Sequence, residues 1–519
     1  MDQKKTGSFY TPKSLVKYMC DYAMNKTQAN NILEPSVGDG RFLHELVEYK
    51  NILVDAVEID EQKVNYLKNN SINSINLICA NFMDYAISTD KKYELIIGNP
   101  PYISKKKLSM EEREKCLKLT EYWSLSDEVF QNTWVTFVLG ALKLLDKSKG
   151  ALFFVLPFEF LQVHYAAKLR NFLEEIFNFI EIITFKESVF PEIDQDVCLV
   201  YLSNEQPGLE PIVRYTTVNG INDFTPIEQS EIRRNKPLKK WSNAILNDNE
   251  IELLKKLTSN YMKISELGHI SPGIVTGANN FFIINRPLVE KFECKDQTIP
   301  IIQKGSNIPN LLLLTDEDFD QVGHNNKNIA MLNLNKINPA NFSKELKEYL
   351  LSGVEKGIDK RYKCSIRKRW YDVPIIHYGD LIFFKRYNIF PRIIVNNASV
   401  YTTDAAYNIK LNGNFDTASV AFCFYNSLTI TLCEYQGRFY GGGVGELVPS
   451  EFKSLSLPYK RIDPHDIKKL DSMLRSNAKL EKIINFVDDI VLAELDKQEI
   501  EQLKAMRHKY LLRRLKSKI

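Results

Sequence analysis

The segment Ile96-Ile97-Gly98-Asn99-Pro100-Pro101-Tyr102 combines groups that suit chemistry on a planar amine. Its two prolines stiffen the chain, so the amide of Asn99, the carbonyl of Pro100 and the ring of Tyr102 would be held close together. Oxygen acceptors that grip both protons of an exocyclic amine push its nitrogen towards a nucleophilic geometry, while an aromatic ring holds the base by stacking. The segment therefore predicts N-methylation without a covalent nucleophile. The alternative is a strand end that is merely capped by proline.

Two further signals lie upstream of this segment. Glu34-Pro35-Ser36-Val37-Gly38-Asp39-Gly40 is expected to turn from a strand into a helix through two glycines, which permit a tight turn and close approach of a ligand. Glu58 ends the next predicted strand, about 20 residues further on, where dinucleotide-type folds hold ribose hydroxyls. These signals predict a nucleotide cofactor, although a dinucleotide enzyme or a plain turn would look alike.

Short apolar runs alternate with amphipathic stretches in the first part of the chain. The runs, each ended by polar residues, Gly or Pro, are 32–33, 53–57, 75–79, 95–97, 152–156, 180–185 and 197–202. Helical periodicity is expected over 41–49, 61–69 and 127–145. This alternation predicts an α/β, Rossmann-like domain with a mostly parallel, seven-stranded sheet and a ligand crevice at the carboxyl ends of its strands.

The order of these motifs resembles the gamma group of S-adenosylmethionine-dependent DNA adenine-N6 methyltransferases, the TaqI-like enzymes of restriction-modification systems. The resemblance covers residues 7–203. It implies that S-adenosyl-L-methionine is bound by Tyr10, Thr11, Glu34, Ser36, Gly38, Gly40, Glu58, Ile59, Asn81 and Phe82. It also implies four catalytic residues, Asn99, Pro100, Tyr102 and Phe190, with the extruded adenine held between the rings of the last two.

One position departs from the family pattern. Residue 81 is Asn where many relatives have Asp, but an amide oxygen can still accept from the amino group of the cofactor adenine. Outside the family context, Phe82 and Phe190 would be ordinary core aromatics.

Charge divides the chain into two parts. Residues 1–210 contain 23 Lys and Arg against 30 Asp and Glu, a net charge of −7, and the remaining 309 residues carry +10. We expect a catalytic domain over 1–210 and an α+β DNA target-recognition domain over 211–519, with a basic helical region from 462 onwards. Basic residues among aromatics, together with a glycine-rich run, suit DNA contact; they are Arg367, Lys368, Arg369, Lys385, Arg386, Arg438, Gly441 and Gly442. Solvated basic faces and a tight glycine loop are the alternatives.

Composition narrows the classes further. With 519 residues, 44% of them apolar and 26% charged, the chain is globular and long enough for two or three domains. It shows no long apolar run or apolar signal core, so a cytoplasmic protein without membrane association is expected. The eight cysteines and seven histidines lack metal-ligand spacing, so reduced thiols and no metal site are expected.

The predicted function is site-specific adenine-N6 methylation of duplex DNA as the modification enzyme of a restriction-modification system. We expect a monomer, with any cognate endonuclease acting as a separate protein. Two alternatives stay open. The Asn-Pro-Pro-Tyr string also suits a methyltransferase for protein glutamine or RNA, and Asn81 slightly favours an inactive DNA-binding subunit of a defence complex.

Overall fold

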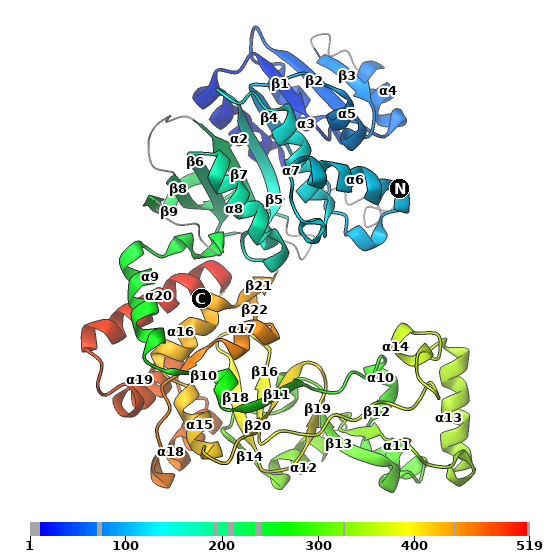
Figure 1. The fold of residues 1–519 in the computed structure, drawn as a ribbon. Coiled ribbons are helices and arrows are strands. Elements are labelled where there is room, and N and C mark those ends of the chain that lie inside the picture. Colours follow the sequence, from blue (N-terminus) through cyan, green and yellow to red (C-terminus); the bar gives the residue numbers. More distant parts are fainter. Residues whose placement is uncertain are drawn as a thin grey trace. The chain divides into compact units, whose positions relative to one another are not determined.

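The computed structural model describes residues 11–69, 75–187, 189–190, 196–204, 212–233, 240–324, 327–440 and 443–515. The chain divides into two compact units (Figure 1). The first is built around Met1–Ile251, and the second comprises Glu252–Phe439 and Gly443–Leu515. No helix within these described ranges is both long enough and apolar enough to cross a bilayer.

The described part of the first unit contains one sheet of nine strands, in the order β3-β2-β1-β4-β5-β7-β6-β8-β9. Its strands are β1 (Asn31–Glu34), β2 (Leu53–Glu58), β3 (Ile75–Cys79), β4 (Leu95–Gly98), β5 (Ala151–Pro157), β6 (Phe179–Phe185), β7 (Val197–Ser203), β8 (Ile212–Gly220) and β9 (Asp223–Arg233). Neighbours from β3 to β5 pair in parallel, and β7 runs antiparallel to both β5 and β6. All seven predicted strands are confirmed, but the prediction of a seven-stranded sheet is wrong.

The two additional strands also move the limit of the first unit. β8 pairs in parallel with β6, and β9 returns antiparallel to β8 at the sheet edge. The first unit therefore continues to Ile251, whereas the sequence prediction ended its first domain at residue 210. Pro226 lies within β9, which is tolerated because an edge strand has backbone N–H groups that face away from the sheet.

Helices cover the sheet in two groups. Those of the first unit are α2 (Lys13–Thr27), α3 (Arg41–Leu46), α4 (Glu61–Asn69), α5 (Phe82–Ser88), α6 (Met110–Tyr122), α7 (Thr133–Leu144) and α8 (Ala167–Ile176). α2 packs on α3, whereas α5, α6 and α7 pack on one another. Strand side chains alternate between the two faces, so Ile32, Val54 and Leu95 join a core cluster with residues of α2 and α3.

The strand order creates a switch point between β1 and β4. From β1 the chain proceeds through β2 and β3 on one side, and it then returns to β4 on the other side of β1. In doubly wound sheets, ligands bind where the strand order reverses, outside the carboxyl ends of the strands. Asn99 directly follows β4, so the Asn-Pro-Pro-Tyr segment begins at this point.

The second unit is mixed α and β. Its larger sheet has the order β11-β20-β16-β18-β14, and a second sheet has the order β12-β15-β13-β19. These strands are β11 (Gly268–Pro272), β12 (Ile283–Ile284), β13 (Thr298–Ile302), β14 (Leu313–Leu314), β15 (Ala330–Leu332), β16 (Leu381–Phe384), β18 (Arg392–Asn396), β19 (Tyr401–Thr402) and β20 (Ala406–Leu411). Its longer helices are α12 (Asp316–His324), α13 (Lys344–Glu355), α15 (Thr417–Phe424), α16 (Ser427–Gln436), α18 (Pro464–Arg475), α19 (Leu480–Val491) and α20 (Lys497–Leu515). The last three helices confirm the predicted helical end.

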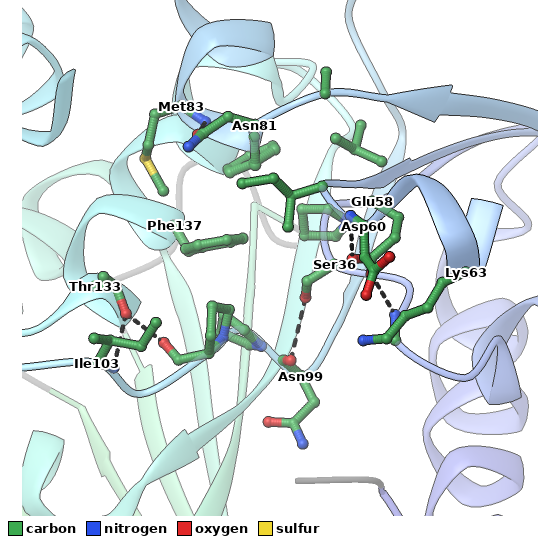
Figure 2. A pocket seen from close by; sticks show the side chains of 18 of the residues that line it. Ser36, Glu58, Asp60, Lys63, Asn81, Met83, Asn99, Ile103, Thr133 and Phe137 are labelled. Atoms are coloured by element: carbon green, nitrogen blue, oxygen red, sulfur yellow. Dashed lines mark hydrogen bonds between the residues drawn. The ribbon is translucent and has the colours of Figure 1, made fainter. Parts of the chain in front are cut away.

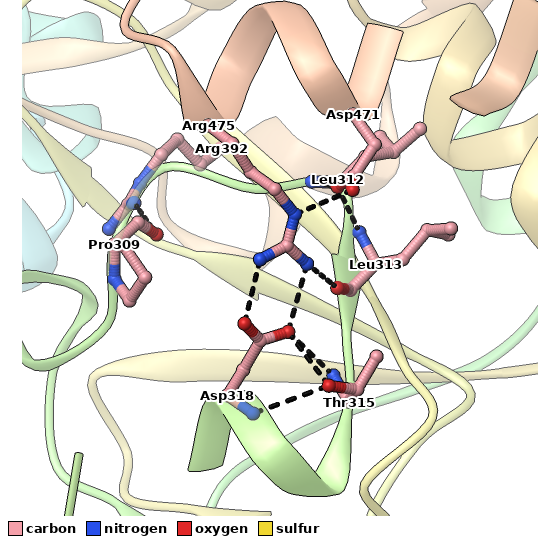
Figure 3. A network of polar contacts seen from close by, with 8 residues as sticks. All are labelled: Pro309, Leu312, Leu313, Thr315, Asp318, Arg392, Asp471 and Arg475. Carbon is pink, nitrogen blue, oxygen red and sulfur yellow. Dashed lines mark hydrogen bonds and ion pairs between the residues drawn. The ribbon is translucent and has the colours of Figure 1, made fainter. Parts of the chain in front are cut away.

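A polar network joins α12, β14 and α18 within this unit (Figure 3). Arg475 donates to the Asp318 carboxylate at 2.7 and 2.9 Å, to the Leu313 carbonyl at 2.8 Å and to Asp471 at 2.6 Å. Asp471 in turn accepts from the backbone N–H groups of Leu312 and Leu313. Hydrogen bonds from Arg475 lower the pKa of Asp318, so the pair stays charged and fixes α18 against the strand.

Candidate active site

A cavity of about 940 Å³ opens at the carboxyl ends of β1, β2, β3 and β4 (Figure 2). Segments that follow each of these strands line it, together with residues of α6 and α7. The predicted site residues on its wall are Ser36, Gly38, Glu58, Ile59, Asn81, Phe82, Asn99, Pro100 and Tyr102. The structure thus brings the predicted cofactor loops and the Asn-Pro-Pro-Tyr segment into one opening.

Glu58 organises the loop after β1. One carboxylate oxygen accepts from the backbone N–H of Gly38 at 2.8 Å, and the other accepts from that of Asp60 at 2.9 Å. Gly38 and Gly40 have φ angles of 62° and 80°, a left-handed conformation that glycine adopts readily. A Cβ atom at Gly40 would lie 2.7 Å from Leu67 Cδ2, so a larger residue would also clash. Gly40 therefore shapes the loop without lining the cavity.

Asn99 is held by three neighbours. Its side-chain amide donates to Thr11 Oγ1 at 3.1 Å, and its Oδ1 accepts from the Tyr102 hydroxyl at 3.0 Å. Its backbone carbonyl accepts from Ser36 Oγ at 3.2 Å (Figure 2). These bonds orient the Oδ1 atom and tie the segment after β4 to the loop after β1. Thr11 is buried and does not line the cavity; its hydroxyl accepts from Asn99, and its backbone carbonyl accepts from Arg41.

The ring of Tyr102 is fixed at its hydroxyl end. The hydroxyl lies 2.9 Å from the Val155 carbonyl on β5, in addition to its contact with Asn99. Burial raises the pKa of Tyr102 well above its ordinary value, because the phenolate would lose its solvation. Tyr102 consequently remains a neutral donor at physiological pH.

Thr133, at the start of α7, was not predicted from the sequence. Its Oγ1 accepts from the backbone N–H of Ile103 at 2.9 Å and donates to the Pro101 carbonyl at 2.6 Å. Its own backbone N–H donates to the Ile103 carbonyl at 2.9 Å. The Thr133 hydroxyl thus binds the backbone of both Pro101 and Ile103, immediately after Pro100 (Figure 2).

A second group of side chains lies at the start of α5 and within α7. Asn81 is the N-cap of α5, since its Oδ1 accepts from the Met83 N–H at 2.8 Å. The rings of Phe82 and Phe137 stack with centroids 4.8 Å apart. Gly140 on α7 permits this packing, because a Cβ atom there would lie 2.9 Å from Phe82 Cε1. Gly140, like Thr133, belongs to no motif that could be recognised in the sequence.

Glu34 is an unusual buried acid. Burial, reinforced by the negative charges of Glu58 and Asp39, raises its pKa well above the ordinary range. Among the described residues, its Oε2 atom has no hydrogen-bond partner. The side chain is 1% exposed and does not line the cavity, and its raised pKa favours the neutral carboxylic acid at this buried position behind the loop.

Tyr10 lies outside the described residues. Phe190 is 9% exposed and belongs to the core cluster against which Tyr102 packs, and it is absent from the cavity wall. The two rings therefore share a cluster, and a base between them remains a prediction.

Three of the arginines predicted to bind DNA are engaged within the second unit. Arg367 donates to the carbonyls of Val275 and Thr276 at 3.2 and 2.8 Å. Arg369 donates to Asp372 at 2.8 Å and also to the backbone carbonyls of residues 334 and 337. Arg438 forms an ion pair with Glu451 at 2.8 Å.

The other predicted DNA contacts differ in exposure. Lys368 is exposed and Lys385 is half-buried. Arg386 is exposed, and its ion pair with Glu446 measures 3.4 Å. Gly441 and Gly442 lie outside the described residues.

The end of the glycine-rich segment is anchored by the C-terminal helix. Arg514 on α20 forms an ion pair with Glu434 at 2.8 Å, and the two side chains are 1% and 5% exposed. Arg514 also donates to the carbonyls of Asn388 and Gly443. Arg514 is therefore a buried residue that stabilises the interior of the second unit.

Two family models match the chain in consecutive stretches. Residues 23–190 match the model described as Eco57I restriction-modification methylase, and residues 238–492 match that of the type II methyltransferase M.Eco57I, C-terminal domain. The class of protein is thus a restriction-modification methyltransferase. The chain belongs to the Eco57I-like family of type II restriction-modification methyltransferases.

Individual proteins extend this similarity. The type II methyltransferase M.AccI of Acinetobacter calcoaceticus is 23% identical over 526 residues, covering 94% of this chain and 93% of the relative. The type II methyltransferase M.HincII of Haemophilus influenzae is 28% identical over 393 residues, covering 75% and 67%. A solved structure described as a cryoEM DrdV-DNA complex shares the fold, with a TM-score of 0.51 at 12% identity over 91% of this chain and 58% of that one.

Proposed function

We propose that this protein transfers a methyl group from S-adenosylmethionine to N6 of an adenine in duplex DNA, as the modification enzyme of a restriction-modification system. The single observation that carries the proposal is the shared cavity. The Gly38 loop, Glu58 and the Asn99–Tyr102 segment open into the same space of about 940 Å³. A cofactor and a reacting amine can therefore meet there without rearrangement of the chain.

The residues on the wall fit this cofactor. Each Glu58 oxygen accepts one backbone N–H group and retains a lone pair for a ribose hydroxyl. Asn81 and Phe82 would hold the adenine of the cofactor. The negative charges of Glu58 and Asp39 favour a cationic ligand. When bound, S-adenosylmethionine supplies an activated methyl group on a sulfonium centre. No metal ion takes part in the proposed reaction.

The Asn99–Tyr102 segment would bind the target base. Asn99 Oδ1 keeps a lone pair beyond its bond from Tyr102, and the Pro100 carbonyl is the second acceptor for the amino protons. The fixed ring of Tyr102 would stack on the base, and Phe190 is proposed for its other face. Preorganised acceptors and positioning would supply the rate enhancement. Extrusion of the base from the duplex costs a few kcal/mol, which DNA contacts elsewhere must offset.

We further propose that the first unit is the catalytic domain and that the second unit recognises the DNA sequence. The net charge of +10 beyond residue 210 supports contact with a polyanion. Lys368 and Arg386 are the predicted basic contacts whose side chains are exposed. A cognate endonuclease would act as a separate protein, and the methyltransferase would act as a cytoplasmic monomer.

Transfer of tritiated methyl groups tests the proposal. Duplex DNA, RNA and a protein mixture are incubated separately with the protein and labelled cofactor, and the labelled base is then identified. We expect N6-methyladenine in duplex DNA alone. Label in RNA or in glutamine would instead establish one of the other substrate classes, and absence of cofactor binding by calorimetry would indicate an inactive DNA-binding subunit.

Asn99→Ala supplies the matching variant. It should abolish transfer while DNA binding stays within about twofold, because positioned acceptors act mainly on the reacting amine. Asn414→Ala, which alters an exposed asparagine in the second unit, is the control. Full activity of Asn99→Ala would refute the assignment of the site.

A further inference from the structure

Three consecutive lysines lie at the rim of the cavity. Lys105, Lys106 and Lys107, here called the basic triplet, form the short 3-10 helix η1 (Lys105–Lys107). The cavity-lining residues Ile103 and Leu108 flank it closely on either side in the chain. Lys106 and Lys107 are exposed, and Lys105 is half-buried. The triplet therefore presents positive charge beside the opening into which the target base would enter.

The backbone of the basic triplet is held in place. The N–H of Lys105 donates to the Gln131 carbonyl at 2.9 Å, and Ser104 forms a β-bridge with Asn132. Thr133 fixes the chain just before the triplet. Because the backbone is fixed, only the lysine side chains would have to be ordered on binding, which reduces the entropic cost of association.

Three acids, Glu111, Glu112 and Glu114, lie close to the triplet in the chain. Glu112 accepts from the backbone and hydroxyl of Ser109 in a capping box, and these bonds lower its pKa. Glu111 pairs with Lys115 at 3.1 Å. Arg113 donates to the Lys106 carbonyl at 3.2 Å and adds a further positive charge. Residues 105–115 contain five basic and three acidic side chains, a net charge of +2, although one of the acids, Glu112, lines the cavity.

The opposite wall of the cavity has the other sign. Glu58, Asp60 and Glu61 line the side that follows β2. An acidic wall suits a sulfonium cofactor, whereas a basic rim suits an anionic substrate strand. This division orients the two ligands of the proposed reaction.

We propose that the basic triplet binds backbone phosphates of the DNA strand that carries the target adenine, next to the extruded nucleotide. This inference rests on the proposed function, since it takes duplex DNA as the substrate. Lysine ammonium groups are compact charges that neutralise phosphates without reading sequence. Lys105 is half-buried, with its ammonium 5.0 Å from the ring centroid of Phe130, whereas Lys106 and Lys107 are exposed and would be the principal contacts.

The triple variant Lys105→Ala, Lys106→Ala, Lys107→Ala tests this inference in the full chain. Its affinity for a fluorescein-labelled duplex is measured by anisotropy between 50 and 200 mM salt. Loss of two phosphate contacts should reduce the slope of log affinity against log salt by about 1.8 and weaken binding by up to ~60-fold at 0.1 M salt. Affinity for S-adenosylhomocysteine, measured by calorimetry, should stay within about twofold because the cofactor wall is untouched.

A matched control removes three lysines from the other edge of the same sheet. Lys92 precedes β4, and Lys147 and Lys149 precede β5, so all three lie near the amino ends of strands. All three are exposed. Their combined replacement by alanine removes the same charge and should leave the salt dependence of DNA binding nearly unchanged.

The outcomes separate this inference from the proposed function. If the triple variant has the wild-type slope and affinity, the role of the triplet is overturned but the proposed function is not. An equal loss of DNA affinity in the control variant would also overturn the role of the triplet, because it would show an effect of net charge only. Absence of duplex binding by the wild-type protein would overturn both proposals. If the triple variant does not fold, Lys106→Glu, a change at one exposed residue, must weaken duplex binding for the inference to stand.

Discussion

Replacing Thr133 by valine should slow methyl transfer without preventing cofactor binding. Valine keeps the branched shape of threonine but lacks the hydroxyl. The backbone N–H of Ile103 would lose its acceptor at 2.9 Å, and the Pro101 carbonyl would lose its donor at 2.6 Å. The hydrogen bond from the backbone of residue 133 to the Ile103 carbonyl would remain. The chain from Pro101 to Ile103 would thus lose two of its three hydrogen bonds to residue 133 and keep the third.

The size of the effect follows from these two bonds. A hydrogen bond contributes about 0.5–1.5 kcal/mol net, and a buried group left unpaired costs about 1–3 kcal/mol. Ile103 is half-buried, so water can partly replace the lost acceptor. We therefore expect a total of about 1–3 kcal/mol, which would lower kcat by about 5- to 150-fold if all of it falls on the reactive arrangement of Asn99 and Tyr102.

Single-turnover transfer of labelled methyl groups, together with calorimetry of S-adenosylhomocysteine, measures both consequences. Thr133→Ser keeps the hydroxyl and should retain kcat within about threefold, since the two hydrogen bonds remain possible. The cofactor Kd should change by less than about threefold in either variant, since neither bond supports the Glu58 wall. Equal kcat values for the valine and serine variants would refute the positioning role of the hydroxyl.

Two further predictions concern the cofactor side of the cavity. Alanine at Gly140 favours the helix by about 1 kcal/mol but overpacks Phe82 by about 1–3 kcal/mol. We therefore expect little change or a small loss in Tm, with a cofactor Kd raised by up to about tenfold in calorimetry. Glu34→Gln should be more stable than the wild type, by an amount that grows as pH rises above about 4.5. The folded-state pKa of Glu34 is raised, so the wild type loses stability as pH rises from the unfolded-state pKa of this group towards its folded-state pKa. Thermal melts across pH 4–8 measure this difference, which should vanish at the acid end.

Each of these predictions has a control. Gly413→Ala introduces a Cβ atom with no neighbour within 4 Å, so it should change neither cofactor affinity nor core packing. If Gly140→Ala binds cofactor as the wild type does, the close packing of Phe82 is irrelevant to the cavity. Parallel melting curves for wild type and Glu34→Gln at every pH would show that Glu34 is not the titrating group.

The strands of the first unit were predictable because most are buried on both faces. Such strands read as short, nearly continuous apolar runs, as β5 and β6 do. β9 escaped prediction for the converse reason, whereas β8 is largely buried but carries the polar residues Arg214, Thr216 and Thr217, which interrupt its apolar run. β9 is a largely exposed edge strand whose sequence contains Glu228, Ser230 and Pro226, so it resembles a polar connection.

The site was predictable only where its residues are contiguous in the sequence. The Asn99–Tyr102 segment and the loop around Gly38 carry their spacing in the chain itself. Thr133 contacts the chain next to the Asn99–Tyr102 segment, and Gly140 contacts Phe82, in both cases from a helix 30 or more residues further along, and no sequence pattern predicts these contacts. Charge was also a poor guide to partners, since Arg367 and Arg438 are satisfied by groups of their own unit.

The buried contact between Arg514 and Glu434 gives the basic end of the chain an unexpected importance. A truncated chain that stops before Arg514 would strand a carboxylate in the interior, and breaking such a pair typically costs about 3–5 kcal/mol. The Gly443 carbonyl would lose its donor in the same step. Removal of this basic tail, for example to reduce nonspecific binding during purification, would therefore destabilise the contact of α20 with Gly443, about 70 residues upstream.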